Sequence, residues 1–180
     1  QTPPIEDSRD NVIQCLDMIR QAANAIALLN GDRLSERRFL ASFSTHAQAL
    51  ERPELYAGLL GVLGSSLVEL DTLHDWVAAW EQDYEDIPDE QRPPKLHRYR
   101  KNYYLQAFKA HLESDQPKNV LWPLLRTWCL ASPSDPTHWQ EACYQLDFLG
   151  PGFPDRLQGI DLYLEQIEEI TETWAQEYGA

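Results

Sequence analysis

Positive charge is scarce in this sequence. The chain of 180 residues carries 15 Lys and Arg residues against 29 Asp and Glu residues, which gives a net charge of −14 at pH 7. A surface this anionic repels the phosphates of nucleic acids and the headgroups of anionic lipids. We therefore expect neither nucleic acid nor membrane as a partner, and we favour a protein partner with a basic surface or a cationic small molecule.

Long apolar runs and cysteines are scarce too. No run approaches the roughly 20 apolar residues that a membrane-spanning helix needs. The three cysteines, Cys15, Cys129 and Cys143, lack the spacing of metal sites, and an odd count favours free thiols in a reducing, cytoplasmic compartment. A disulfide between Cys129 and Cys143 across a helical hairpin stays open. Because the first residue is Gln1, we expect an excised domain or a processed exported protein.

The motifs of common catalytic and cofactor sites are missing. GLLGVLG, residues 58–64, has neither the Lys nor the preceding strand of a phosphate-binding loop. The acidic runs 83–90 and 165–172 lack the spacing of a calcium-binding loop, and no Glu-x-x-His pair suggests a di-iron bundle. We expect no catalytic residue and no cofactor, and we lean towards a protein that is not an enzyme.

What the sequence does contain is helical periodicity. Apolar residues recur every three or four positions, and strict alternation is missing, so we predict an all-α protein of about seven helices. It should form a helical bundle or a short stack of helical hairpins. Helices are expected over 8–29, 35–51, 53–84 with a break near Gly64, and 95–114. A further helix begins near Pro117, a separate one ends near Phe148, and the last helix covers 155–177.

One acidic, Pro-rich segment interrupts this periodicity. Residues 85–94, EDIPDEQRPP, hold three Pro and almost nothing apolar. We predict a single all-helical domain, 1–180, with sub-units 1–84 and 95–180 joined by this linker.

Two stretches resemble each other. FLASFSTHA, residues 39–47, and YLQAFKAHL, residues 104–112, both place a His three positions after a Phe. This pattern suggests two pseudo-repeated three-helix units, in which Phe43 and His46 are equivalent to Phe108 and His111. The two histidines are weak candidates for metal ligands, but further ligands are missing. We expect instead hydrogen-bonded histidines at helix interfaces and no metal.

Two further segments supply candidate binding residues. KLHRYRKNYY, residues 95–104, is a cationic island interleaved with tyrosines, and WPLLRTW, residues 122–128, combines two Trp with an Arg. The candidates are Arg98, Tyr99, Arg100, Lys101, Tyr103, Trp122 and Arg126. The island could hold an anionic ligand, but we expect it to pair with acids of the linker or the last helix. We expect WPLLRTW to belong to the core.

These observations favour an acidic, non-enzymatic helical module that binds a protein with a basic surface. The alternative is a helical accessory or substrate-binding domain excised from a larger enzyme, for example of the nucleotidyltransferase type, with an acidic groove for a cationic substrate.

Overall fold

The structure is a computed structural model that describes residues 5–131 and 136–179. These residues contain eight α-helices and no strand, so the predicted all-α class is confirmed. The α-helices are α1 (Ile5–Leu28), α2 (Phe39–Ala49), α3 (Glu54–Val62), α4 (Leu70–Glu85), α5 (Lys101–Leu112), α6 (Leu121–Leu130), α7 (Thr137–Gln145) and α8 (Phe153–Tyr178). Short 3-10 turns join them: η1 (Glu36–Arg38), η2 (Ser65–Leu67), η3 (Asp89–Gln91), η4 (Pro94–Leu96), η5 (Arg98–Arg100), η6 (Pro117–Val120) and η7 (Gly150–Gly152).

Glycine accounts for the expected break near Gly64, and proline accounts for one difference from the expected helix boundaries. The pattern over 53–84 is divided because Gly64 adopts φ +75°, a left-handed conformation that ends α3. The helix expected from residue 95 begins only at Lys101, after the turns η4 and η5. Pro93 and Pro94 cannot donate a backbone hydrogen bond, and proline disfavours helical geometry in the residue before it.

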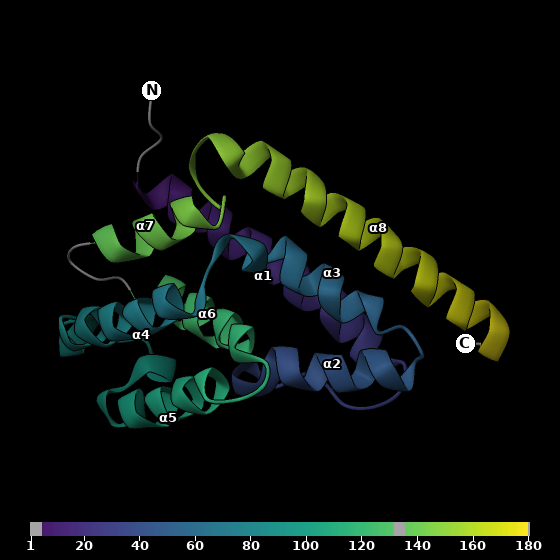
Figure 1. Cartoon of the computed structure of the whole chain (residues 1–180), viewed down its shortest axis with the longest axis horizontal. Helices are drawn as coiled ribbons and strands as arrows, with labels where there is room; N and C mark the ends of the chain where they lie inside the picture. The colour runs from purple at the N-terminus through teal and green to yellow at the C-terminus, as the bar shows by residue number, and fades with distance from the viewer. Residues whose placement is uncertain (1–4, 132–135, 180) are drawn as a thin grey trace.

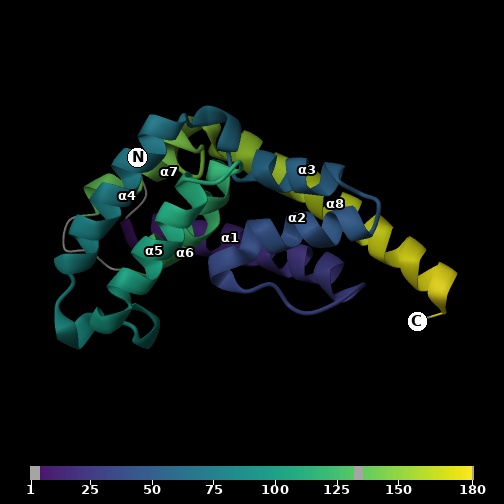
Figure 2. The ribbon, with the colours of Figure 1, turned by 60° about the horizontal axis from the view of Figure 1, so that its bottom comes forward.

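The helices form two contacting groups (Figures 1 and 2). In the first group α1 contacts α2 and α8, and α3 contacts α2 and α8. In the second group α4 contacts α5, α6 and α7. Helix α6 also contacts α1 and α2, and one cluster of buried residues includes side chains from all eight helices. Both predicted sub-units therefore contribute to the same core.

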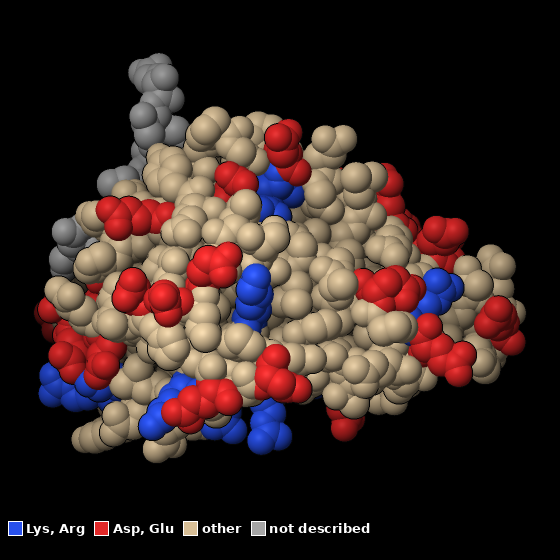
Figure 3. All heavy atoms as spheres, viewed as in Figure 1, with Lys and Arg blue, Asp and Glu red and all other residues tan. Residues whose placement is uncertain are grey.

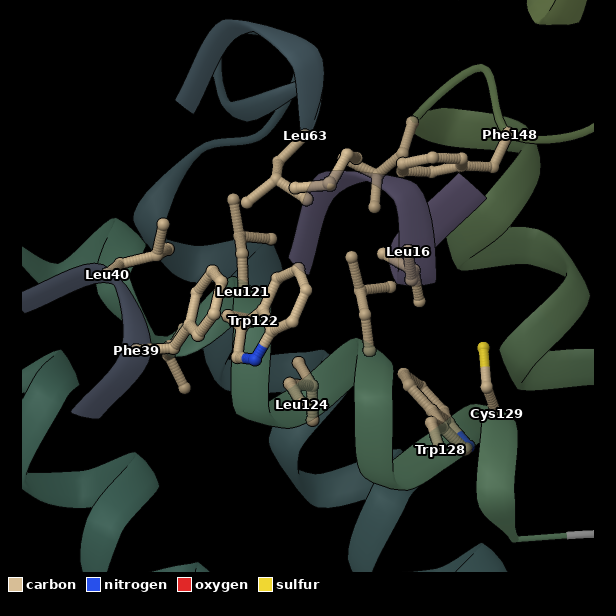
Figure 4. Close-up of a cluster of buried hydrophobic side chains, with 14 of the residues drawn as sticks. Leu16, Phe39, Leu40, Leu63, Leu121, Trp122, Leu124, Trp128, Cys129 and Phe148 are labelled. Atoms are coloured by element: carbon tan, nitrogen blue, oxygen red, sulfur yellow. The ribbon is translucent and has the colours of Figure 1, made fainter. Parts of the chain in front are cut away.

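Helix α6 lies in the middle of this core (Figure 4). Every residue from Leu121 to Cys129 is buried, including the whole WPLLRTW segment. The ring of Trp122 stacks on Phe39 of α2 at 3.8 Å between centroids. Polar groups of α6 find partners on α4: Trp80 Nε1 donates to Thr127 Oγ1 at 2.9 Å, and Trp128 Nε1 donates to Asp83 Oδ2 at 2.7 Å.

The acidic segment 85–94 is folded against its neighbours. Ile87 is buried, and so is Leu96 immediately beyond the segment. The hydroxyl of Tyr84 donates to the backbone carbonyls of Leu96 at 2.7 Å and His97 at 2.9 Å. The guanidinium of Arg92 lies over the Tyr84 ring, 5.0 Å from its centroid. These contacts fix the path of the chain between α4 and α5.

The two histidines of the predicted repeat lie at helix interfaces with different partners. His46 Nδ1 donates to Asn30 Oδ1 at 2.6 Å, and His111 Nε2 donates to the backbone carbonyl of Arg37 at 2.8 Å. Phe43 and Phe108 are both fully buried. The equivalence of the two three-helix units stays a prediction. Among the described residues, no group of three or more His, Cys, Asp and Glu side chains could hold a metal ion.

A first prediction concerns the turn at Gly64. A Cβ added there would lie 3.0 Å from the carbonyl oxygen of Leu146, in a backbone conformation that side chains disfavour. We expect Gly64→Ala to lower the free energy of unfolding by about 1–3 kcal/mol. Gly159→Ala is the matched control, because a Cβ there meets nothing within 4 Å in the middle of α8. The control should raise stability by up to about 1 kcal/mol in denaturant titration. Equal effects of the two substitutions would contradict this account of the turn.

A second prediction concerns the thiols. All three cysteines are buried and free. Burial raises the pKa of the Cys129 thiol to about 11, and it also raises the pKa values of Cys15 and Cys143. Because only exposed thiolates react readily, a disulfide reagent at about pH 8 should label no cysteine in the native protein and all three in denaturant. Rapid labelling of one thiol per native chain would contradict the packing around it.

Candidate functional site

The cationic island divides into two sets of residues. In the first set, Lys101 Nζ donates to Glu81 at 3.1 Å and to Glu85, and Arg98 pairs with Asp89 at 3.5 Å. The hydrogen bond to Glu85 is the main cause of a raised Lys101 pKa. The acids that pair with Arg98 and Lys101 therefore come from the end of α4 and the segment that follows it. Figure 3 shows that many Lys and Arg side chains of the visible face gather along its lower edge, beside α5.

The second set lines two adjoining pockets. Arg100 and Tyr103 line a pocket of about 230 Å³, and Trp122 and Arg126 line its neighbour of about 410 Å³. The remaining candidate, Tyr99, is 88% exposed and stacks on His97. The structure thus brings together four of the predicted site residues, from two segments that are separate in the sequence.

Sequence reasoning did not assign the other charged residues of these pockets. Glu36 and Lys95 line both pockets, Arg37 lines the smaller, and Asp17 and Arg20 line the larger. Lys95 belongs to the cationic island but is not among the candidate site residues. The others lie on α1 and η1, and no motif links those segments to residues 95–104, so only the fold places them together.

Arg126 is an unusual member of the larger pocket, because it is an Arg that is only 8% exposed. Its Nη1 lies 3.1 Å from Asp17 Oδ1, and its Nε lies 3.7 Å from Glu36 Oε1. Both Nε and Oε1 are buried without a hydrogen bond. Two carboxylates thus compensate the buried charge of Arg126, although its Nε is too far from Glu36 Oε1 for a hydrogen bond.

A separate cleft lies beside the C-terminal part of α8. We call it the acidic cleft; its volume is about 470 Å³, and α8 forms one wall while the ends of α1 and α2 and the following residues form the other. Its lining residues are Leu29, Ala49, Leu50, Glu51, Arg52, Ile170, Thr173, Trp174, Glu177 and Tyr178. The members from α8 recur at helical spacing, so they share one face of the helix.

The acidic cleft exists because the apolar stripe of α8 extends beyond the helices that pack against it. Ile160, Tyr163 and Ile167 are buried, whereas Trp174 is half-buried and Tyr178 is 68% exposed. Figures 1 and 2 show the C-terminal part of α8 extending past the ends of α2 and α3. Trp174 and Tyr178 stack on each other at 4.8 Å between ring centroids. The periodicity predicted the stripe but not the length over which neighbours cover it.

Charge around this cleft has one dominant sign. After Arg156 the chain has six acidic residues, the last being Glu177, and no basic one. Glu177 and Glu51 contribute carboxylates to the lining, and the single cation there, Arg52, lies 3.5 Å from Glu54. The glutamates of the acidic run 165–172 are exposed. The cleft therefore combines apolar and aromatic residues with polar and acidic ones.

Comparison of the chain with protein-family models, curated proteins and solved structures finds no match. No helix in the described part of the chain has both the length and the apolar character needed to cross a membrane.

A third prediction asks whether the apolar end of α8 serves folding. Trp174 lies where the bundle covers only part of α8, so Trp174→Ala should lower the free energy of unfolding by less than about 1 kcal/mol. Ile167 is buried earlier in α8, so Ile167→Ala should lower the free energy of unfolding by about 2–5 kcal/mol. Chemical denaturation of both variants checks this. A large loss for Trp174→Ala would show that the residue belongs to the core.

Proposed function

We propose that this protein is an acidic helical interaction module that holds a basic, amphipathic segment of a partner protein in the acidic cleft. One observation carries the proposal: the apolar stripe of α8 continues beyond the helices that pack against it, and α8 has no basic residue after Arg156. Apolar side chains of the partner fill the cleft, and its Lys and Arg residues face the surrounding glutamates.

The composition of the cleft supports this reading. Large aromatic side chains often supply much of the binding energy of an interface, and Trp174 and Tyr178 line the cleft here. Leu28, at the end of α1 and adjacent in sequence to the lining residue Leu29, is 52% exposed. Exposed carboxylates around such a surface select cationic partners and speed their encounter.

The alternative of an excised accessory domain needs an acidic groove for a cationic substrate, and it finds less support. Asp17 and Glu36 are the carboxylates of the larger pocket, but both lie within ion-pair distance of Arg126. Their charge is already compensated by a cation of the chain itself. The acidic cleft has no such internal partner for Glu177 among the described residues.

A fourth prediction tests the module directly. The probes are an amphipathic helical peptide of Leu and Lys and the same peptide with Glu replacing Lys. We expect saturable binding of the Lys peptide alone by calorimetry, with affinity falling between about 0.05 M and 0.5 M salt. Trp174→Ala should weaken binding by roughly 2 kcal/mol, or about thirtyfold, as for an aromatic residue at the centre of an interface.

A charge-matched control separates the cleft from the general acidity of the protein. Glu51→Gln with Glu177→Gln should weaken binding several-fold, since both carboxylates line the cleft. Glu69→Gln with Glu141→Gln removes the same charge from two exposed positions outside the cleft, one immediately before α4 and one on α7, and should leave affinity unchanged. Equal losses in both double variants, or an undiminished affinity in Trp174→Ala, would refute the proposal. Self-association in place of peptide binding, measured by sedimentation, would assign the cleft to a second copy of the chain.

A further inference from the structure

The smaller of the two adjoining pockets is a cationic pocket at the opposite end of α2 from the acidic cleft. Its cations are Arg37 on η1, Lys95 on η4 and Arg100 at the start of α5. The pocket shares Glu36 and Lys95 with the larger pocket beside it. Their volumes, about 230 and 410 Å³, are together typical of sites for small molecules.

Hydrogen bonds and ring contacts hold the walls of this cationic pocket in place. His111 Nε2 donates to the backbone carbonyl of Arg37 at 2.8 Å, and the Tyr104 hydroxyl donates to the backbone carbonyl of Lys95 at 3.2 Å. The guanidinium of Arg37 lies over the Tyr103 ring, 4.3 Å from its centroid. A guanidinium stacked by its face keeps its N–H edges available for hydrogen bonds. The pocket is therefore formed before any ligand binds.

The charge of the cationic pocket is only partly compensated within the described part of the chain. Lys95 pairs with Glu36 at 3.6 Å, whereas neither Arg37 nor Arg100 makes an ion pair with a described residue. In a protein with 29 acidic residues, cations elsewhere in the same island, Arg98 and Lys101, do have carboxylate partners. Helix α5 begins beside Arg100 without a side-chain cap and adds positive potential there.

We propose that the cationic pocket binds the phosphate group of a phosphorylated small molecule, whose organic part occupies the larger pocket. Two guanidiniums and an ammonium match a dianion with three terminal oxygens better than a carboxylate with two. In the larger pocket, the partly exposed side chains of Asp17 and Arg20 offer acceptors and donors to polar groups of the organic part. The adjacent surface of Trp122 supplies an apolar wall.

The test uses the full chain with defined probes. Inorganic phosphate, adenosine 5′-monophosphate and glucose 6-phosphate are titrated at constant ionic strength, with adenosine and glucose as the same molecules without phosphate. We expect saturable binding of both esters by calorimetry, weaker binding of inorganic phosphate and none of the unphosphorylated pair. Arg37→Gln and Arg100→Gln should each weaken ester binding about tenfold, since each removes one charge-assisted contact.

Arg98→Gln is the matched control, because it removes the same charge from the same island at a residue that pairs with Asp89. It should change affinity less than twofold, and circular dichroism should show all three variants folded. Loss of binding in Arg98→Gln equal to that in Arg100→Gln would refute the pocket in favour of diffuse electrostatics. Binding of a phosphoserine peptide without binding of either ester would overturn the small-molecule assignment. Absence of saturable binding by every phosphate probe would overturn the proposal entirely.

Discussion

The rest of this structure depends on the burial of α6 from all sides. A helix with no exposed face must satisfy its polar groups against its neighbours, because none can reach water. Here three surrounding helices supply partners: Arg9 Nε of α1 donates to the Cys129 carbonyl, Trp139 of α7 donates to the Cys129 thiol, and α4 provides Trp80 and Asp83. These pairings orient the surrounding helices more specifically than apolar packing alone would. The surface features described above follow from the positions they set.

Arg126 shows how this constraint reaches the surface. A charged residue in an otherwise apolar helix requires compensating charge, and α1 and η1 bring Asp17 and Glu36 to it. Placing Glu36 there also places the next residue, Arg37, opposite the start of α5. The cationic pocket is thus a consequence of compensating one buried guanidinium. A side chain that stabilises the core thereby positions others that face solvent.

The sequence was sufficient for some of this and not for the rest, for identifiable reasons. The helical class and the buried WPLLRTW segment follow from periodicity, which is a local signal. The ion pairs that Arg98 and Lys101 make with acidic residues follow from opposite charges nearby in the sequence. The cationic pocket requires Arg37 to lie near Arg100, and no sequence motif indicates that these two distant segments come together. The acidic cleft needs the lengths of α1 and α2 relative to α8, and a hydrophobic stripe looks the same whether or not it is covered.

Opposite charges within one chain neutralise each other unless the fold separates them, and α2 performs that separation here. The cationic pocket lies at its start and the acidic cleft at its end. Its 11 residues, at about 1.5 Å each, span about 16 Å. That is about two Debye lengths at physiological salt, so each surface presents its own field to approaching molecules. If α8 instead lay against the start of α5, its seven acids would compensate Arg37 and Arg100, and both surfaces would lose their charge. A short, uncharged helix between them, with His46 as its only ionisable side chain, therefore keeps two surfaces of opposite charge apart in one small bundle.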